Sequence, residues 1–68
     1  MKTFGKLREK IRAKFQNTEN FAKAMEMDRS TLSGKLNSKT GWKQTEIEKA
    51  CKLLDIPMEE VVDYFFYD

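Results

Sequence analysis

The chain has 68 residues, of which 40% are hydrophobic and 35% charged, and its net charge at pH 7 is +2. That length suits one small domain, which we place at residues 1–68, and the composition is that of a folded protein. Residues 1–15 alternate charged and apolar side chains, and no apolar run approaches the roughly 20 residues of a membrane span. We therefore expect neither a signal peptide nor a membrane segment, and a cytoplasmic location.

The residue types present argue against an enzyme. The chain has no histidine and one cysteine, so it lacks the commonest neutral-pH acid–base group and the ligands of a zinc site. Its three glycines form no phosphate-binding loop. We expect no catalytic residue, metal, cofactor or small-molecule ligand. We also expect Cys51 to be a small buried hydrophobic residue, without a disulfide partner.

Charge is divided unevenly along the chain. Residues 1–43 hold 11 Lys and Arg against 4 Asp and Glu, a net charge of +7, whereas residues 44–68 carry −5. This division favours a surface for a polyanion. A solvated surface whose charges mix on folding is the alternative.

Apolar spacing predicts two helices in the first part of the chain. The stripe of the first helix consists of Phe4, Leu7, Ile11 and Phe15. The inner face of the second consists of Phe21, Ala22 and Met25. Thr3 and Thr18 are the expected N-caps, and Glu19 suits the first turn of the second helix.

Three more short helices follow. Asp28 is the expected cap of the third, whose buried side is Leu32 and Leu36. The fourth is predicted from Ile47, Ala50, Cys51 and Leu54. The fifth has Pro57 in its first turn and Val61, Val62 and Phe65 directed inward. The predicted fold class is therefore all-α, with five short helices and no convincing strand.

The third helix carries an unusual outer face. At about 100° per residue, Ser30, Ser33, Gly34 and Asn37 lie opposite Leu32 and Leu36. These small and polar residues let a helix backbone approach a partner closely. Arg29 stands at the N-terminal end, as in a recognition helix that enters the DNA major groove.

The segment from Thr18 to Asn37, TENFAKAMEMDRSTLSGKLN, resembles the helix-turn-helix of lambda-repressor-like proteins, which include phage Cro and repressor proteins and xenobiotic-response-element regulators. The later stretch from Trp42 to Pro57, WKQTEIEKACKLLDIP, is similar to the fourth helix and following turn of short phage-borne members. Two positions depart from the family. Glu26 occupies the turn where glycine is common, so we expect tolerated backbone strain there, and Lys35 replaces an apolar residue.

The resemblance implies a site on DNA. Recognition helix 28–37 would enter the major groove, and the base-contacting positions are Arg29, Ser30, Ser33 and Gly34. The positions that contact the sugar–phosphate backbone are Thr18, Asn37, Ser38, Lys39 and Lys43. Arg29 has an alternative as a surface residue paired with Glu26.

Aromatic residues late in the chain suggest a dimer interface. Trp42 fits either the core, which we favour slightly, or a dimer contact. Tyr64 and Phe66 belong to a cluster with more aromatic surface than one short helix easily buries. The Cro resemblance implies a homodimer contact there, and packing against the first helix is the alternative.

The sequence thus predicts a Cro-like phage or prophage repressor in the bacterial cytoplasm or nucleoid. As a homodimer it would occupy a pseudo-palindromic operator in double-stranded DNA. The alternative is a protein-interaction module of the antitoxin or anti-repressor type on the same helical scaffold.

Overall fold

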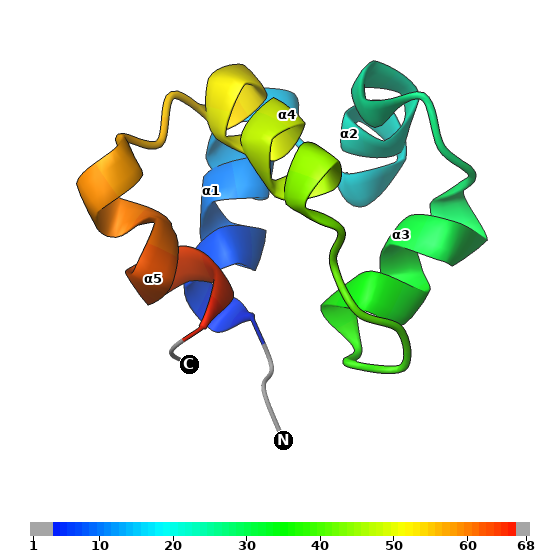
Figure 1. Cartoon of the computed structure of the whole chain (residues 1–68). Helices are drawn as coiled ribbons and strands as arrows, with labels where there is room; N and C mark the ends of the chain where they lie inside the picture. Colours follow the sequence, from blue (N-terminus) through cyan, green and yellow to red (C-terminus); the bar gives the residue numbers. More distant parts are fainter. Residues whose placement is uncertain (1–3, 67–68) are drawn as a thin grey trace.

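The computed structural model describes residues 4–66, which form five α-helices and one short 3₁₀ helix, with no strand in this range (Figure 1). The elements are α1 (Gly5–Phe15), α2 (Thr18–Met25), α3 (Arg29–Leu36), α4 (Gln44–Leu54), η1 (Met58–Glu60) and α5 (Val61–Phe65). The prediction of an all-α fold with five short helices is confirmed. None of the helices within residues 4–66 has the length and apolarity needed to cross a bilayer.

Helix α1 is the centre of the packing. It contacts α2, α4 and α5, whereas α3 packs mainly on α2 (Figure 1). The stripe predicted for α1 is buried at Phe4, Leu7 and Ile11, and Phe15 packs against Phe21 at a ring distance of 5.2 Å. The other predicted core positions buried with them are Ala22, Met25, Leu32, Leu36, Ala50, Leu54 and Phe65. Removing this apolar surface from water is the main stabilising contribution.

The helix caps differ from the prediction. Asn17, not Thr18, is the N-cap of α2, and its Oδ1 accepts a hydrogen bond of 2.8 Å from the Asn20 amide. Thr18 is the first residue of the helix, because Asn17 already has the extended backbone and the acceptor that an N-cap requires. Asp28 is the N-cap of α3 but makes no side-chain cap bond. Phe4 is the N-cap of α1 and makes no side-chain cap bond, so the cap predicted at Thr3, which lies outside the described residues, is wrong.

The turn between α2 and α3 has the expected left-handed residue. Glu26 ends α2 with φ 60° and ψ 43°, a region that favours glycine. The Met27 amide then donates to Ala22 O at 3.0 Å, and Met27 packs against the core. A residue other than glycine is accommodated here with the strain expected from the sequence.

The last helix also departs from the prediction. Pro57 precedes η1 instead of standing in the first turn of α5. Val62, expected inside, is 45% exposed, while Tyr64 and Phe65 are buried. Because α5 has only five residues at about 100° each, the side that carries Tyr64 and Phe65 includes Val61 but turns Val62 outward.

Candidate functional surfaces

The outer face of α3 is formed by the residues predicted to contact bases. Arg29, Ser30 and Ser33 are exposed and Gly34 is half-buried, while Leu32 and Leu36 on the opposite side are buried. The exposed part of this small polar face, at Arg29, Ser30 and Ser33, is accessible to a partner.

The loop after α3 is tied to the helix and to α1. The Lys39 amide donates to Gly34 O at 2.8 Å. Arg8 of α1 donates from Nη2 to Leu36 O at 2.8 Å and to Asn37 Oδ1 at 2.9 Å. Asn37 Nδ2 in turn donates to Ser33 Oγ at 3.2 Å. The structure therefore gathers Ser33, Asn37 and Lys39 at one end of α3, and the orientation of Asn37 by Arg8 was not predicted from the sequence.

The remaining predicted backbone-contacting residues are placed as follows. Ser38, Lys39 and Lys43 are exposed, and Ser38 has φ 61° in the turn after α3. Thr18 is half-buried at the start of α2, where it shares a hollow of about 250 Å³ with Arg8 and Arg12 of α1.

Glu26 does not pair with Arg29. Its Oε1 accepts a hydrogen bond of 2.7 Å from Lys49 Nζ on α4, and this contact lowers the pKa of Glu26. The alternative interpretation of Arg29 as the partner of Glu26 is thus not what the structure shows.

Lys35 is buried and joins α3 to the region around α4. Its ammonium lies 2.9 Å from Glu46 Oε1 and donates to Gly41 O at 3.0 Å. Burial acts to raise the pKa of Glu46, but the bonds from the Lys43 amide and the Lys35 ammonium outweigh it, and the pKa is lowered. The charge of Lys35, at a position where the resemblance to lambda-repressor-like proteins implies an apolar residue, is therefore balanced by the counter-charge of Glu46.

The aromatic residues predicted for a dimer interface separate into core and surface. Trp42 is half-buried between Phe4 and Phe65, with ring distances of 6.3 and 5.1 Å. Tyr64 is 7% exposed, and the Lys6 ammonium lies 4.9 Å from its ring centre. Tyr64 is therefore a core residue, because the short α5 turns it toward α1, and it does not offer the surface that an interface requires. Phe66 is 51% exposed.

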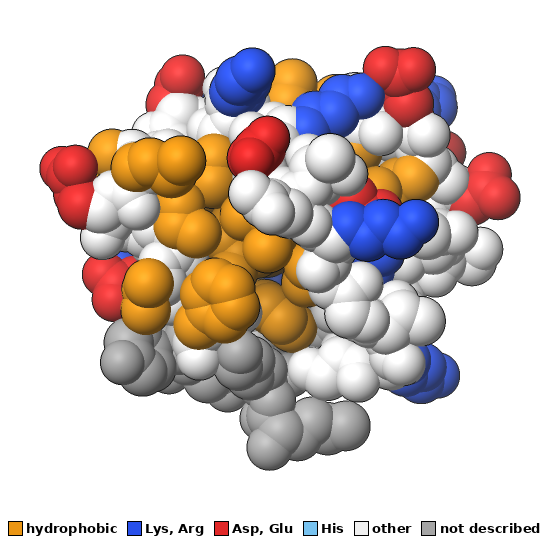
Figure 2. All heavy atoms as spheres, viewed as in Figure 1, with side chains coloured by type: hydrophobic (Ala, Val, Ile, Leu, Met, Phe, Trp, Pro, Cys, Tyr) orange, Lys and Arg blue, Asp and Glu red, His pale blue; other side chains and the backbone are white. Residues whose placement is uncertain are grey.

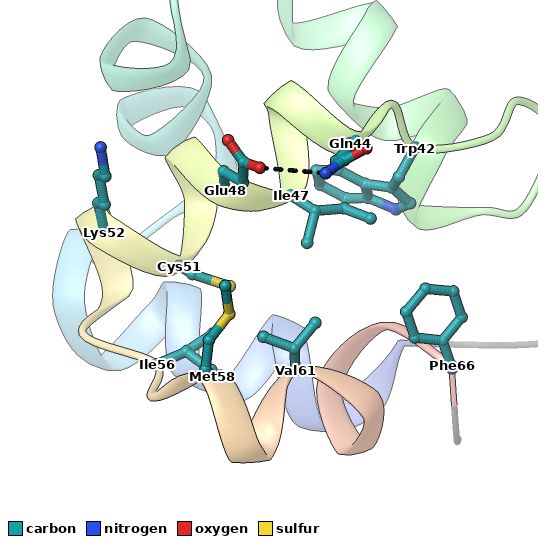
Figure 3. A pocket seen from close by; sticks show the side chains of 10 residues that line it. All are labelled: Trp42, Gln44, Ile47, Glu48, Cys51, Lys52, Ile56, Met58, Val61 and Phe66. Atoms are coloured by element: carbon teal, nitrogen blue, oxygen red, sulfur yellow. Dashed lines mark hydrogen bonds between the residues drawn. The ribbon is translucent and has the colours of Figure 1, made fainter.

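A groove runs between α4 on one side and η1 and α5 on the other (Figure 3). We call it the α4–α5 groove; its volume is about 680 Å³. Its apolar lining consists of Trp42, Ile47, Cys51, Ile56, Met58, Val61 and Phe66, and its polar lining of Gln44, Glu48 and Lys52. In Figure 3 the side chains of α4 and α5 point toward one another across it, and Gln44 donates to Glu48 at 3.3 Å along one edge.

The α4–α5 groove was not predicted from the sequence. Cys51, expected in the core, is half-buried in its wall, where burial raises the pKa of the thiol. Met58 is 78% exposed beside it. Figure 2 shows the resulting patch of apolar side chains over this part of the molecule. The only feature of the sequence that pointed to an exposed apolar surface here was the excess of aromatic residues at the end of the chain.

Comparison with known proteins places the chain in a family. The model of the family described as "Protein of unknown function (DUF739)" matches residues 2–68. The chain belongs to this family. It is also similar to the solution structure of the modulator of repression (MOR) of the temperate bacteriophage TP901-1 from Lactococcus lactis, with 36% identity and a TM-score of 0.85 over 98% of this chain and 89% of that chain. A search of curated proteins gave no match.

Proposed function

We propose that this protein is a phage regulator that acts on repression by binding another regulatory protein through the α4–α5 groove. Its likeness to a modulator of repression extends over 98% of the chain, so that the whole five-helix unit is shared. This supports the anti-repressor type of interaction module over a Cro-like repressor that acts by operator occupancy alone.

The observation that carries the proposal is the exposed apolar lining of the groove. Met58 and Phe66 expose 78% and 51% of their surface beside half-buried Ile47 and Val61. Contiguous exposed apolar patches are typical of protein–protein contacts. DNA is a poor occupant, because its backbone is polyanionic and the segment from residue 44 onward is acidic.

Operator binding through α3 is the second candidate function. It is favoured by exposed Arg29, Ser30 and Ser33 and by the orientation of Asn37 through Arg8. In this candidate the chain is a lambda-repressor-like helix-turn-helix protein that binds a pseudo-palindromic operator as a homodimer. The two candidates use different faces of the molecule and are separable by mutation.

An electrophoretic mobility assay tests the proposal. The DNA is the operator region of the phage or prophage that encodes this chain. It is mixed with the repressor from the same genome, with this protein, or with both. We expect the protein alone to leave the DNA unshifted and to change the shift produced by the repressor.

Two variants assign the effect to a surface. Met58→Asp places a charge in the groove and should abolish the effect on the repressor, whereas Arg29→Ala on α3 should retain it. A shift of operator DNA by this protein alone, lost in Arg29→Ala and kept in Met58→Asp, would contradict the proposal and establish the second candidate.

A further inference from the structure

Resting on the proposed function, we infer that the α4–α5 groove binds an amphipathic helix of a different protein, whose apolar face is flanked by Lys and Arg. The segment that occupies the groove is thus defined by its secondary structure and by its charge.

The shape of the groove suits a helix. One wall is formed by Ile47 and Cys51 of α4, and the facing wall by Met58, Val61 and Phe66 (Figure 3). An elongated apolar channel between two helices accepts the stripe of residues that an amphipathic helix presents every three or four positions. Ile56, which is buried, closes the channel near the turn after α4.

The charge around the groove selects a basic segment. Glu48 lines the groove from α4. Glu59 and Glu60 are outside the lining but follow Met58, a lining residue, on η1. We call these three residues the acidic rim. Figure 2 shows acidic side chains at both edges of the apolar patch. None of the three pairs with a basic side chain within residues 4–66, and the one basic residue of the lining is Lys52.

Other acidic residues of this region are already compensated. Glu46 lies 2.9 Å from Lys35, and Asp55 lies 2.6 Å from Lys14. The acidic rim is the negative charge that stays available to a partner. Cations placed beside the apolar stripe of an incoming helix would meet it, which favours the correct partner and speeds association.

A second copy of this chain is a poor occupant. A symmetric contact places the same groove on both sides and brings one acidic rim against another. The basic amphipathic helix that this chain contains is α1, but its apolar stripe at Leu7 and Ile11 is 0% and 1% exposed. A second copy cannot offer that stripe without unfolding, so the helix must come from another protein.

The test uses two designed helical peptides of about 18 residues, long enough to form a helix in water. Both have leucine at positions spaced by three and four, and one is flanked by lysine, the other by glutamate. Trp42 is the one tryptophan of the chain and lines the groove, so its fluorescence reports occupancy. Amide chemical shifts of the labelled protein locate the contact.

We expect the lysine-flanked peptide to bind at least about tenfold more tightly than the glutamate-flanked peptide at low salt, with shifts centred on Ile47, Cys51 and Val61. Glu48→Lys combined with Glu59→Lys should remove this preference. Met58→Ser should weaken binding of the lysine-flanked peptide. The matched control Val62→Ser, an exposed apolar residue outside the lining, should not.

Equal affinity for the two peptides, no binding of either, shifts centred on α3, or concentration-dependent self-association through the groove would each overturn the inference. The proposed function is judged separately with the full-length repressor. If Met58→Asp abolishes the repressor effect while both peptides fail, the groove binds protein but its occupant is not a basic helix.

Discussion

The ammonium of Lys35 lies 2.9 Å from the carboxylate of Glu46, and this ion pair joins the end of α3 to the first turn of α4. The two side chains are only 7% and 20% exposed. Lys35 also donates to Gly41 O, so it fixes the loop that leads into α4. One contact thus connects the helix with the small polar face to the helix that forms one wall of the groove.

Breaking this pair from one side should destabilise the fold. Lys35→Met leaves Glu46 without its counter-charge and should lower the free energy of unfolding by about 2 kcal/mol. The double variant Lys35→Met with Glu46→Gln should recover more than half of the loss, since no unpaired charge remains. Urea unfolding of the wild type, both single variants and the double variant measures the coupling. Additive losses would show that the two side chains do not stabilise each other.

Acid should destabilise the protein through its paired carboxyls. The Lys14 ammonium lowers the pKa of Asp55 from its ordinary value of 3.8. The pKa values of Glu26 and Glu46 are also lowered, from their ordinary value of 4.5. A pKa lower in the folded than in the unfolded state stabilises the fold above the unfolded value and loses this contribution as pH falls.

We therefore expect the urea midpoint to be constant near neutral pH and to fall between about pH 5 and about pH 3. Lys14→Met removes the partner of Asp55 and should make the fall shallower. A midpoint that rises on acidification would contradict the assignment of these ion pairs.

The left-handed residue between α2 and α3 should be improved by glycine. Glu26→Gly relieves the strain at φ 60° but removes the ion pair with Lys49. This pair is exposed to water and therefore contributes little to stability. We expect Tm to rise by about 4 °C. Glu26→Gln, which keeps the strain and loses the charge, is the control and should not raise Tm. If Glu26→Gly melts at or below the wild type, the strain is not significant.

The N-cap of α2 gives a paired test of the local structure. Asn17→Ala removes the acceptor for the Asn20 amide and should cost about 1 kcal/mol, whereas Thr18→Ala, one residue inside the helix, should cost much less. Chemical denaturation of both variants under the same conditions compares them. Equal losses would restore Thr18 as a capping residue.

The helices were predictable because their apolar positions recur with helical spacing and are buried as expected, from Leu7 in α1 to Leu54 in α4. Details that change when a helix begins one residue earlier or later were not predictable. Asn17 and Thr18 are adjacent residues that both cap well, and only the backbone decides between them. Val62 was predicted to be buried because valine is apolar, but a helix of five residues buries only one narrow face, and Val62 is not on it.

For the candidate surfaces too, features within one helix were predictable from the sequence and features formed between helices were not. The face of α3 follows from spacing within one helix, so Ser30 and Ser33 were placed outside correctly. The α4–α5 groove is lined by residues of α4 and of the elements that follow the turn at Ile56, and this tertiary relationship has no periodic signal in the sequence. Arg8 was missed for the same reason, since its partner Asn37 lies 29 residues away.

Binding of a repressor in the α4–α5 groove is tested most directly by the affinity of this protein for the repressor of its own phage or prophage. Titration calorimetry measures this affinity for the wild type, Met58→Asp and Arg29→Ala. We expect the wild type and Arg29→Ala to bind the repressor alike and Met58→Asp to bind it at least about tenfold more weakly. Circular dichroism and thermal melts should show that all three are equally folded. Full affinity in Met58→Asp, or no binding of the wild type, would contradict the assignment of the α4–α5 groove as the protein-binding surface.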